Sequence, residues 1–272
     1  MEIYKYNQVK IRPKPDFIIE TGEYVTSIIN INRTHYVISK KNILEVWDFN
    51  EGIMIHQFIE HTKDIGLLLR IPNTFRDSIF NGFNIVSSAS NGEIIFWDLI
   101  NYKPRFKLQG SPEIIFNKII YSENKLIAYD KMNTINIWDC NNGNLLNHVS
   151  IDTKYISDIH LIDKNRIVLQ TNNKILILDL NTLNIISTLE HKYIINSSGI
   201  LPDGKIITAS GEIPRPNEYT SNPISNKTLN IWDPNTYLMI KQIETYQRIN
   251  HILILNNKSV STVCDNILEF RL

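Results

Sequence analysis

Asn42–Asn50 reads NILEVWDFN, and the chain ends at Asn266–Leu272 with NILEFRL. The Trp-Asp pair of the first stretch recurs, and two further positions in the same frame carry Leu-Asp and Arg-Leu. The six anchors are Trp47-Asp48, Trp97-Asp98, Trp138-Asp139, Leu178-Asp179, Trp232-Asp233 and Arg271-Leu272. Because their intervals are 50, 41, 40, 54 and 39 residues, the chain repeats with a basic period near 40 residues.

The residues around each anchor repeat as well. A short run of β-forming residues precedes each anchor, as in EIIFW and TINIW, and a turn rich in Asn or Gly follows each of the first five. Another apolar stretch comes after each turn, and two more come before each anchor. Asp, Asn and Gly are typical turn residues, and no 3.6-residue periodicity is evident. The sequence therefore predicts an all-β chain with about four short strands in each repeat.

Four strands in a repeat of about 40–45 residues, closed by Trp-Asp, resemble the WD40 family of β-propellers. The resemblance runs from about Asp16 to Leu272 and implies four-stranded antiparallel blades that pack face to face. The Trp is expected to fill the contact between blades, and the Asp to accept backbone N–H bonds in the turn that follows.

The repeats depart from the family pattern in their polar residues. The family's Gly-His is reduced to Glu60-His61 and Glu190-His191. Lys41, Asn91 and Asn172 stand near the place of the family's buried Asp. We therefore expect incomplete His–Asp–Trp networks.

Six anchors predict a single propeller of six blades, with the commoner seven as the alternative. The chain stops on the third strand of the sixth blade, so the fourth strand must come from elsewhere. We expect residues 16–20, DFIIE, to pair antiparallel with residues 266–272 and close the ring. Residues 16–272 then form the propeller, and residues 1–15 an N-terminal arm or extra strand.

The composition excludes several classes of protein. Lys and Arg together number 28, as do Asp and Glu, which argues against a general nucleic-acid binder. No apolar run approaches the length of a membrane helix, and no secretory signal is seen. Cys140 and Cys264 form no cluster and are expected to be free thiols, so we expect an intracellular, cytoplasmic protein.

No motif for catalysis, metal binding or cofactor binding is found. The seven histidines lack the spacing of metal ligands, and no nucleotide-binding or nucleophile motif occurs. Asp158 and His160 share one face of a predicted strand, where a surface hydrogen bond is the simpler interpretation. We expect no enzyme activity, no metal and no cofactor.

The resemblance implies a scaffold that binds proteins on the face with the loops before the first and third strands. The insertion Gly211–Lys227 lies there and explains the longest interval; a loop without a function is the alternative. Tyrosines that precede first strands, with one neighbouring Arg, could rim the channel or simply pack between blades. The candidate partner-binding residues are Arg215, Glu218, Tyr219, Tyr24, Tyr193, Tyr246 and Arg248, with Phe75, Arg76 and Phe80 as a weaker second patch.

Three functions compete at this point. The first is a scaffold that recruits proteins or peptides, as a monomer or in a hetero-complex. The second is a structural subunit of a larger assembly, and the third an enzyme or small-ligand binder that uses the central channel. The more specific hypothesis of a substrate receptor for a ubiquitin ligase is weakened, because such propellers often carry Trp-Asp-x-Arg. In this chain the residues after Trp-Asp-x are Asn50, Ile100, Asn141 and Asn235.

Overall fold

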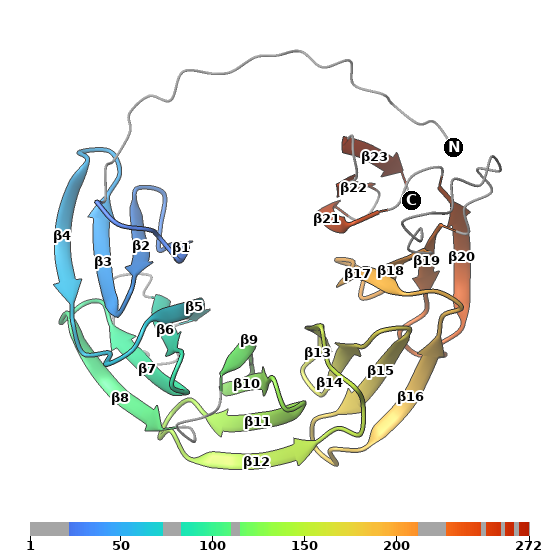
Figure 1. Cartoon of the computed structure of the whole chain (residues 1–272), viewed down its shortest axis with the longest axis horizontal. Coiled ribbons are helices and arrows are strands. Elements are labelled where there is room, and N and C mark those ends of the chain that lie inside the picture. The colour runs from blue at the N-terminus through green and yellow to red at the C-terminus, as the bar shows by residue number, and fades with distance from the viewer. Residues whose placement is uncertain are drawn as a thin grey trace, which may run out of the picture. The chain divides into compact units, whose positions relative to one another are not determined.

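Short β-strands account for the regular structure of the chain. The computed structural model describes residues 22–72, 83–109, 115–211, 227–245, 249–256, 259–263 and 267–271. These residues form 23 strands, and none of them is helical. The strands pair in chain order into six antiparallel sheets (Figure 1). The all-β class and the four-strand repeat are thus confirmed.

Three sheets belong to a first compact unit, which ends at Asp152. Sheet 1 comprises β1 (Ser27–Asn30), β2 (His35–Lys40), β3 (Ile43–Asp48) and β4 (Ile53–Phe58). Sheet 2 comprises β5 (Ile65–Pro72), β6 (Phe83–Ala89), β7 (Glu93–Asp98) and β8 (Lys103–Gln109). Sheet 3 comprises β9 (Phe116–Ser122), β10 (Lys125–Asp130), β11 (Thr134–Asp139) and β12 (Leu145–Ser150).

The other three sheets belong to a second unit, which begins at Thr153. Sheet 4 comprises β13 (Asp158–Asp163), β14 (Arg166–Gln170), β15 (Lys174–Asp179) and β16 (Ile185–Glu190). Sheet 5 comprises β17 (Ile195–Ile200), β18 (Ile206–Ser210), β19 (Thr228–Trp232) and β20 (Met239–Glu244). Sheet 6 comprises β21 (His251–Asn256), β22 (Ser259–Val263) and β23 (Ile267–Arg271).

The third strand of a sheet is buried on both faces, and the fourth is largely exposed. Four successive residues of β7, β11 and β15 are buried, whereas most of β12 and β16 is exposed. A strand covered on both faces needs a continuous apolar run, which explains why the anchors end stretches such as EIIFW.

Apolar cores lie between neighbouring sheets within each unit. In the first unit, Val46 of sheet 1 packs with Ile95 and Trp97 of sheet 2, and Phe96 of sheet 2 belongs to a core with Trp138 of sheet 3. The second unit has corresponding cores between sheets 4 and 5 and between sheets 5 and 6. The anchor Trp therefore fills contacts between sheets, as expected.

The turn after the anchor is held by its Asp in the first five sheets. Oδ1 of that Asp accepts a hydrogen bond from the N–H two residues later, at 2.8–2.9 Å. The backbone N–H groups of Thr182 and Thr236, three residues after the respective Asp, donate to the same carboxylates and, with the bonds just described, hold the pKa of Asp179 and Asp233 below its usual value. The bond expected from the sequence is confirmed in five turns.

The same turns share a left-handed residue five positions after the anchor. It is Gly52 (φ 68°), Tyr102 (φ 49°), Gly143 (φ 76°), Leu183 (φ 58°) or Tyr237 (φ 60°). A β-bulge also lies next to the anchor in each of these sheets. A positive φ strains any residue with a Cβ, so the turn geometry is imposed even where the sequence lacks glycine.

The expected ring closure lies outside the described residues. Residues 16–20 are not among them, and β23 pairs with β22 alone in the described part of the chain. Five sheets have four strands and the sixth has three. Five of the six sheets therefore match the predicted four-stranded blade, and the sixth does so for three of its four strands.

Two glycines in equivalent turns give a matched test of packing. Gly52 and Gly143 have similar φ, but a Cβ on Gly52 would meet nothing within 4 Å, whereas one on Gly143 would lie 2.7 Å from Leu108 Cδ2. Gly52→Ala should lower the free energy of unfolding by about 1 kcal/mol through backbone strain. Gly143→Ala should lower it by about 2–3 kcal/mol, because overpacking adds to that strain. Urea unfolding measures both, and equal losses would contradict this account of the turn.

Candidate functional site

Most of the predicted partner-binding residues lie outside the described residues. They are Arg215, Glu218, Tyr219, Tyr246 and Arg248, together with the second patch of Phe75, Arg76 and Phe80. Tyr24 is described, 94% exposed and placed shortly before β1 in the first unit. Tyr193 is described in the connection from β16 to β17 of the second unit, where it lines a cavity.

Sheet 2 carries a closed polar network, which serves as a reference for that cavity. His61 Nδ1 lies 2.7 Å from Glu93 Oε2, and its Nε2 lies 2.6 Å from Ser87 Oγ. Trp97 Nε1 donates to the same Ser87 Oγ at 2.7 Å. Because a carboxylate only accepts, Nδ1 of His61 carries the proton and Nε2 accepts from Ser87. The expectation of incomplete networks is wrong for this sheet, where Glu93 supplies the acid.

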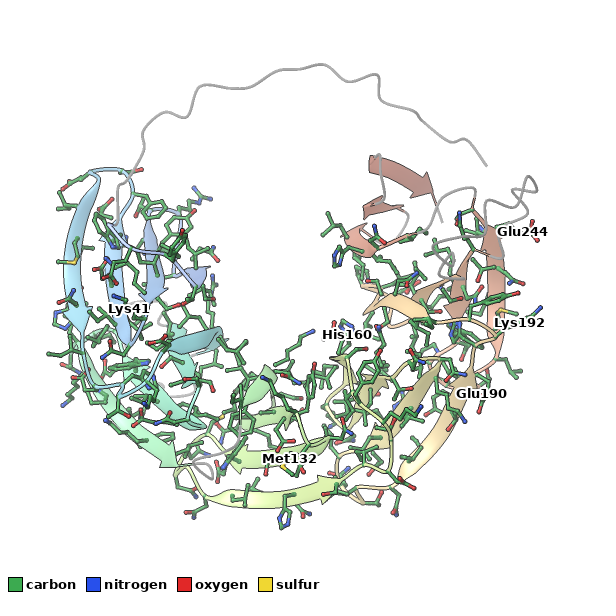
Figure 2. The ribbon with its side chains drawn as sticks, in the orientation of Figure 1. Lys41, Met132, His160, Glu190, Lys192 and Glu244 are labelled. Atoms are coloured by element: carbon green, nitrogen blue, oxygen red, sulfur yellow. The ribbon has the colours of Figure 1, made fainter. Side chains whose placement is uncertain are left out.

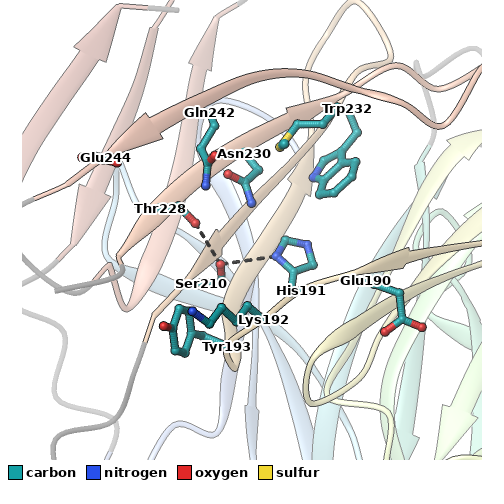
Figure 3. Close-up of a pocket in the computed structure, with 11 residues that line it drawn as sticks. Glu190, His191, Lys192, Tyr193, Ser210, Thr228, Asn230, Trp232, Gln242 and Glu244 are labelled. Carbon is teal, nitrogen blue, oxygen red and sulfur yellow. Dashed lines mark hydrogen bonds between the residues drawn. The ribbon is translucent and has the colours of Figure 1, made fainter.

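Sheet 5 carries the corresponding residues in an open arrangement. Trp232 Nε1 donates to Thr208 Oγ1 at 3.0 Å, as Trp97 does to Ser87. His191 does not join that pair: its Nδ1 lies 3.3 Å from Ser210 Oγ, which is 3.1 Å from Thr228 Oγ1 (Figure 3). Thr228 stands four residues before the anchor Trp, where sheet 2 has Glu93. The acid is therefore missing, and the network of sheet 5 is incomplete as expected.

Two buried polar atoms in this region have no hydrogen-bond partner. They are Nε2 of His191 and Oδ1 of Asn230, and both residues are only 6% exposed. A buried polar atom without a partner costs free energy, so native structures keep few of them. Burial also lowers the pKa of His191 to about 4, which keeps its imidazole neutral at neutral pH.

A cavity of about 300 Å³ adjoins these two residues. Its walls come from the end of β16, the connection to β17, the end of β18, and strands β19 and β20 (Figure 3). The lining residues are Glu190, His191, Lys192, Tyr193, Ser210, Thr228, Asn230, Trp232, Met239, Gln242 and Glu244. Since a water molecule occupies about 30 Å³, the space suits a side chain or a small ligand.

The rim of the cavity carries charges of both signs. Figure 2 labels Glu190, Lys192 and Glu244, all on the second unit. Glu190 is paired with Lys174 Nζ at 2.8 Å, and Lys192 Nζ lies 5.2 Å from the centroid of the Tyr193 ring. Glu244 is exposed and takes part in none of the ion pairs among the described residues.

Sequence reasoning proposed Tyr193 as a binding residue and singled out Glu190-His191 and the anchor Trp232 as parts of the repeat, but it gave the remaining lining residues no role. Ser210 and Thr228 lie next to the two ends of the insertion Gly211–Lys227, so its length was the available signal. Gln242 and Glu244 stand in an exposed fourth strand, where polar residues are ordinary. Only the pairing of β19 with β20 brings them to the site.

Other sequence features behave as single contacts. His160 Nε2 lies 3.2 Å from Asp158 Oδ2, which confirms that the two side chains share a face.

Cys140 is a buried free thiol whose pKa burial raises to about 12, and Cys264 lies outside the described residues. Within the described ranges, no cluster of three or more possible metal ligands is found. None of the described residues forms a helix that could span a membrane.

Comparison with known proteins identifies the fold only. No protein-family model matches the chain, and no curated protein matches it. The computationally designed Ika8 protein is similar, with a TM-score of 0.68 and 14% identity over 91% of this chain and 71% of that chain. A chain of a Mitotic Checkpoint Complex structure is similar, with a TM-score of 0.65 and 16% identity over 93% of this chain and 76% of that chain. The repeated four-stranded sheets and these neighbours fit a β-propeller.

The burial of His191 predicts a stability that falls in mild acid. Its pKa is about 4 in the folded chain and 6.5 without the fold, so between pH 6.5 and 4 the unfolded chain binds more protons. Its contribution should therefore be complete above pH 6.5 and shrink by up to about 3 kcal/mol as the pH falls to 4. Urea unfolding between pH 7.5 and 4.5 measures the slope.

Two variants separate this effect from general acid denaturation. His191→Asn should flatten the slope in this window, because it removes the titrating group. His148→Asn makes the same substitution at an exposed histidine and serves as the control. Equal slopes for His191→Asn and the unmodified chain would contradict the assignment.

Proposed function

We propose that the chain is a non-enzymatic interaction scaffold, a six-bladed β-propeller that recruits partner proteins. The partner would dock on the face that carries the connections β16–β17 and β18–β19. The fold supports this proposal, since propellers of this type present loops from several blades on one face. An intracellular, cytoplasmic setting is part of the proposal and fits the free thiol of Cys140.

One observation carries the choice of face. The cavity of sheet 5 opens between the connection with Tyr193 and the two strands, β18 and β19, that the Gly211–Lys227 insertion joins. It combines the rings of Tyr193 and Trp232 and the side chain of Met239 with a larger number of polar and charged groups, so a partner could be held there by both kinds of contact. Tyrosine is also a frequent anchor at protein interfaces, because it buries a large ring and keeps a polar end.

The cavity also supports a second candidate function, the binding of a small ligand. Its volume of about 300 Å³ is at the lower end for ligand sites, and two of its residues have unpartnered polar atoms. A soluble metabolite would bind without any partner protein. Binding of a protein to the same residues favours the scaffold.

We further propose that residues 16–20 supply the fourth strand of sheet 6. The support is that sheets 1–5 each have four strands, whereas β23 has a single partner strand among the described residues. An unpaired edge is open to pairing with another chain, and closure within the chain removes it.

A pair of truncations tests the closure. Removing residues 1–15 should leave the stability unchanged. Removing residues 1–20 should lower the free energy of unfolding by at least about 2 kcal/mol, because three apolar side chains and a strand pairing are lost. Thermal and urea unfolding compare the two, and equal stabilities would rule out this strand as the closing one.

Two tyrosines at equivalent places test the docking face. Tyr193→Ala should weaken binding of a partner, identified by cross-linking in native cells, by tenfold or more. Tyr155→Ala is the matched control, because Tyr155 lies in the corresponding connection before β13 and is 46% exposed. Quantitative pull-down measures both variants after circular dichroism has confirmed their folding. Equal retention of the partner would place the interface elsewhere.

A further inference from the structure

We infer that the cavity of sheet 5 receives an arginine side chain of the partner protein. This inference rests on the proposed scaffold function and names the chemistry of the docked group. It is carried by the two unpartnered polar atoms beside the cavity, by the carboxylate at its rim and by its aromatic and apolar walls.

The interior of the cavity requires hydrogen-bond donors. Oδ1 of Asn230 is an acceptor without a partner. Nε2 of His191 is a second acceptor in the tautomer that carries the ring proton on Nδ1, and the inference requires this tautomer. In that tautomer Nδ1 donates to Ser210 Oγ, and Ser210 donates to Thr228 Oγ1, which gives a continuous chain of bonds. A ligand that pairs with both atoms must therefore bring donors.

A guanidinium group meets this requirement best. It carries five N–H donors and no acceptor, so it leaves no new unpartnered acceptor in the cavity. It is also more weakly hydrated than an ammonium group, so its burial is less costly, and its plane stacks on aromatic rings. Both acceptors are buried, so the inference includes a rotation of the His191 and Asn230 side chains when the ligand binds.

The walls and rim suit the rest of an arginine side chain. Trp232 and Met239 offer apolar surface to the methylene stem, and Tyr193 offers a ring at the entrance. Glu244 supplies a carboxylate that forms no ion pair with the described residues. Lys192 lies at the same rim, and its positive charge repels a cationic ligand. Removing the charge of Glu244 should therefore weaken the binding of a cation, and removing the charge of Lys192 should strengthen it.

Titration with blocked amino acids tests the inference on the full chain. The probes are N-acetyl-arginine methylamide, its uncharged citrulline counterpart and the lysine counterpart. We expect the arginine probe to shift the NMR signals of the Trp232 indole N–H and the His191 ring nitrogens, and to bind at least fivefold more tightly than the other two. Nitrogen shifts of His191 should also show the Nδ1–H tautomer. Equal binding of arginine and citrulline, or no shifts at saturating probe, would overturn the inference.

Variants at the rim and wall of the cavity should change the affinity for the arginine probe in a way that a purely structural role of these residues does not predict. Glu244→Gln should weaken the arginine probe two- to fivefold, and Lys192→Gln should tighten it by a similar factor. Asn230→Leu should abolish binding without loss of stability, because it also removes a buried unpartnered acceptor. Asn136→Leu is its control, since Asn136 stands at the same position of sheet 3, two residues before the anchor Trp. Weaker binding in Lys192→Gln would contradict a cationic ligand.

The two proposals fail in distinguishable ways. If the arginine probe does not bind but Tyr193→Ala still loses its partner protein, the scaffold stands and the guanidinium inference falls. If the probe binds but no partner protein depends on Tyr193, the cavity is a site for a small cationic ligand and the scaffold assignment falls.

Discussion

The hydrogen bonds that the anchor Asp accepts from the turn that follows are the interaction on which each of the first five repeats depends. They hold a turn that contains a left-handed residue and follows a β-bulge, so the fourth strand returns beside the third. In sheet 4 the anchor Trp is replaced by Leu178, yet Asp179 keeps the bond and the strands pair as elsewhere. The aromatic ring can therefore be replaced by another apolar residue, whereas the carboxylate is retained in all five turns.

The anchor Trp creates a second constraint, because its indole N–H needs an acceptor where the ring is buried or half-buried. In sheets 2 and 5 the acceptor is a hydroxyl group of the neighbouring strand, from Ser87 or Thr208 respectively. Sheet 1 meets it with Glu45, whose carboxylate accepts from Trp47 at 2.9 Å and is paired with Lys40 at 2.6 Å. The same backbone repeat thus accommodates different polar solutions, which explains why the sequence repeats look degenerate although the sheets are alike.

Much of the fold could be predicted from the sequence because apolar periodicity and the Asp turns are local. The third strands, the turn bonds and the four-strand repeat all follow from residues within one period. The polar networks could not be predicted in the same way. Glu93 acts as the acid of sheet 2 from a strand position and not from the turn where the family places it. The left-handed Leu183 and Tyr237 also escape prediction, because neither residue favours that conformation.

The candidate site shows how a gap in a structural network can become a binding site. In sheet 2, Glu93 reaches His61 and closes the network. The shorter Thr228 at the same position in sheet 5 leaves His191 bound to Ser210 through one nitrogen only. The nitrogen without a partner is Nε2, which in His61 is bonded to Ser87; in sheet 5 the corresponding hydroxyl, Thr208, accepts from Trp232 and not from His191. A structural role alone would favour restoring the acid or replacing the polar residues with apolar ones, since either change removes the cost of the unpartnered atoms. The inferred arginine side chain would remove the same cost by donating to both atoms.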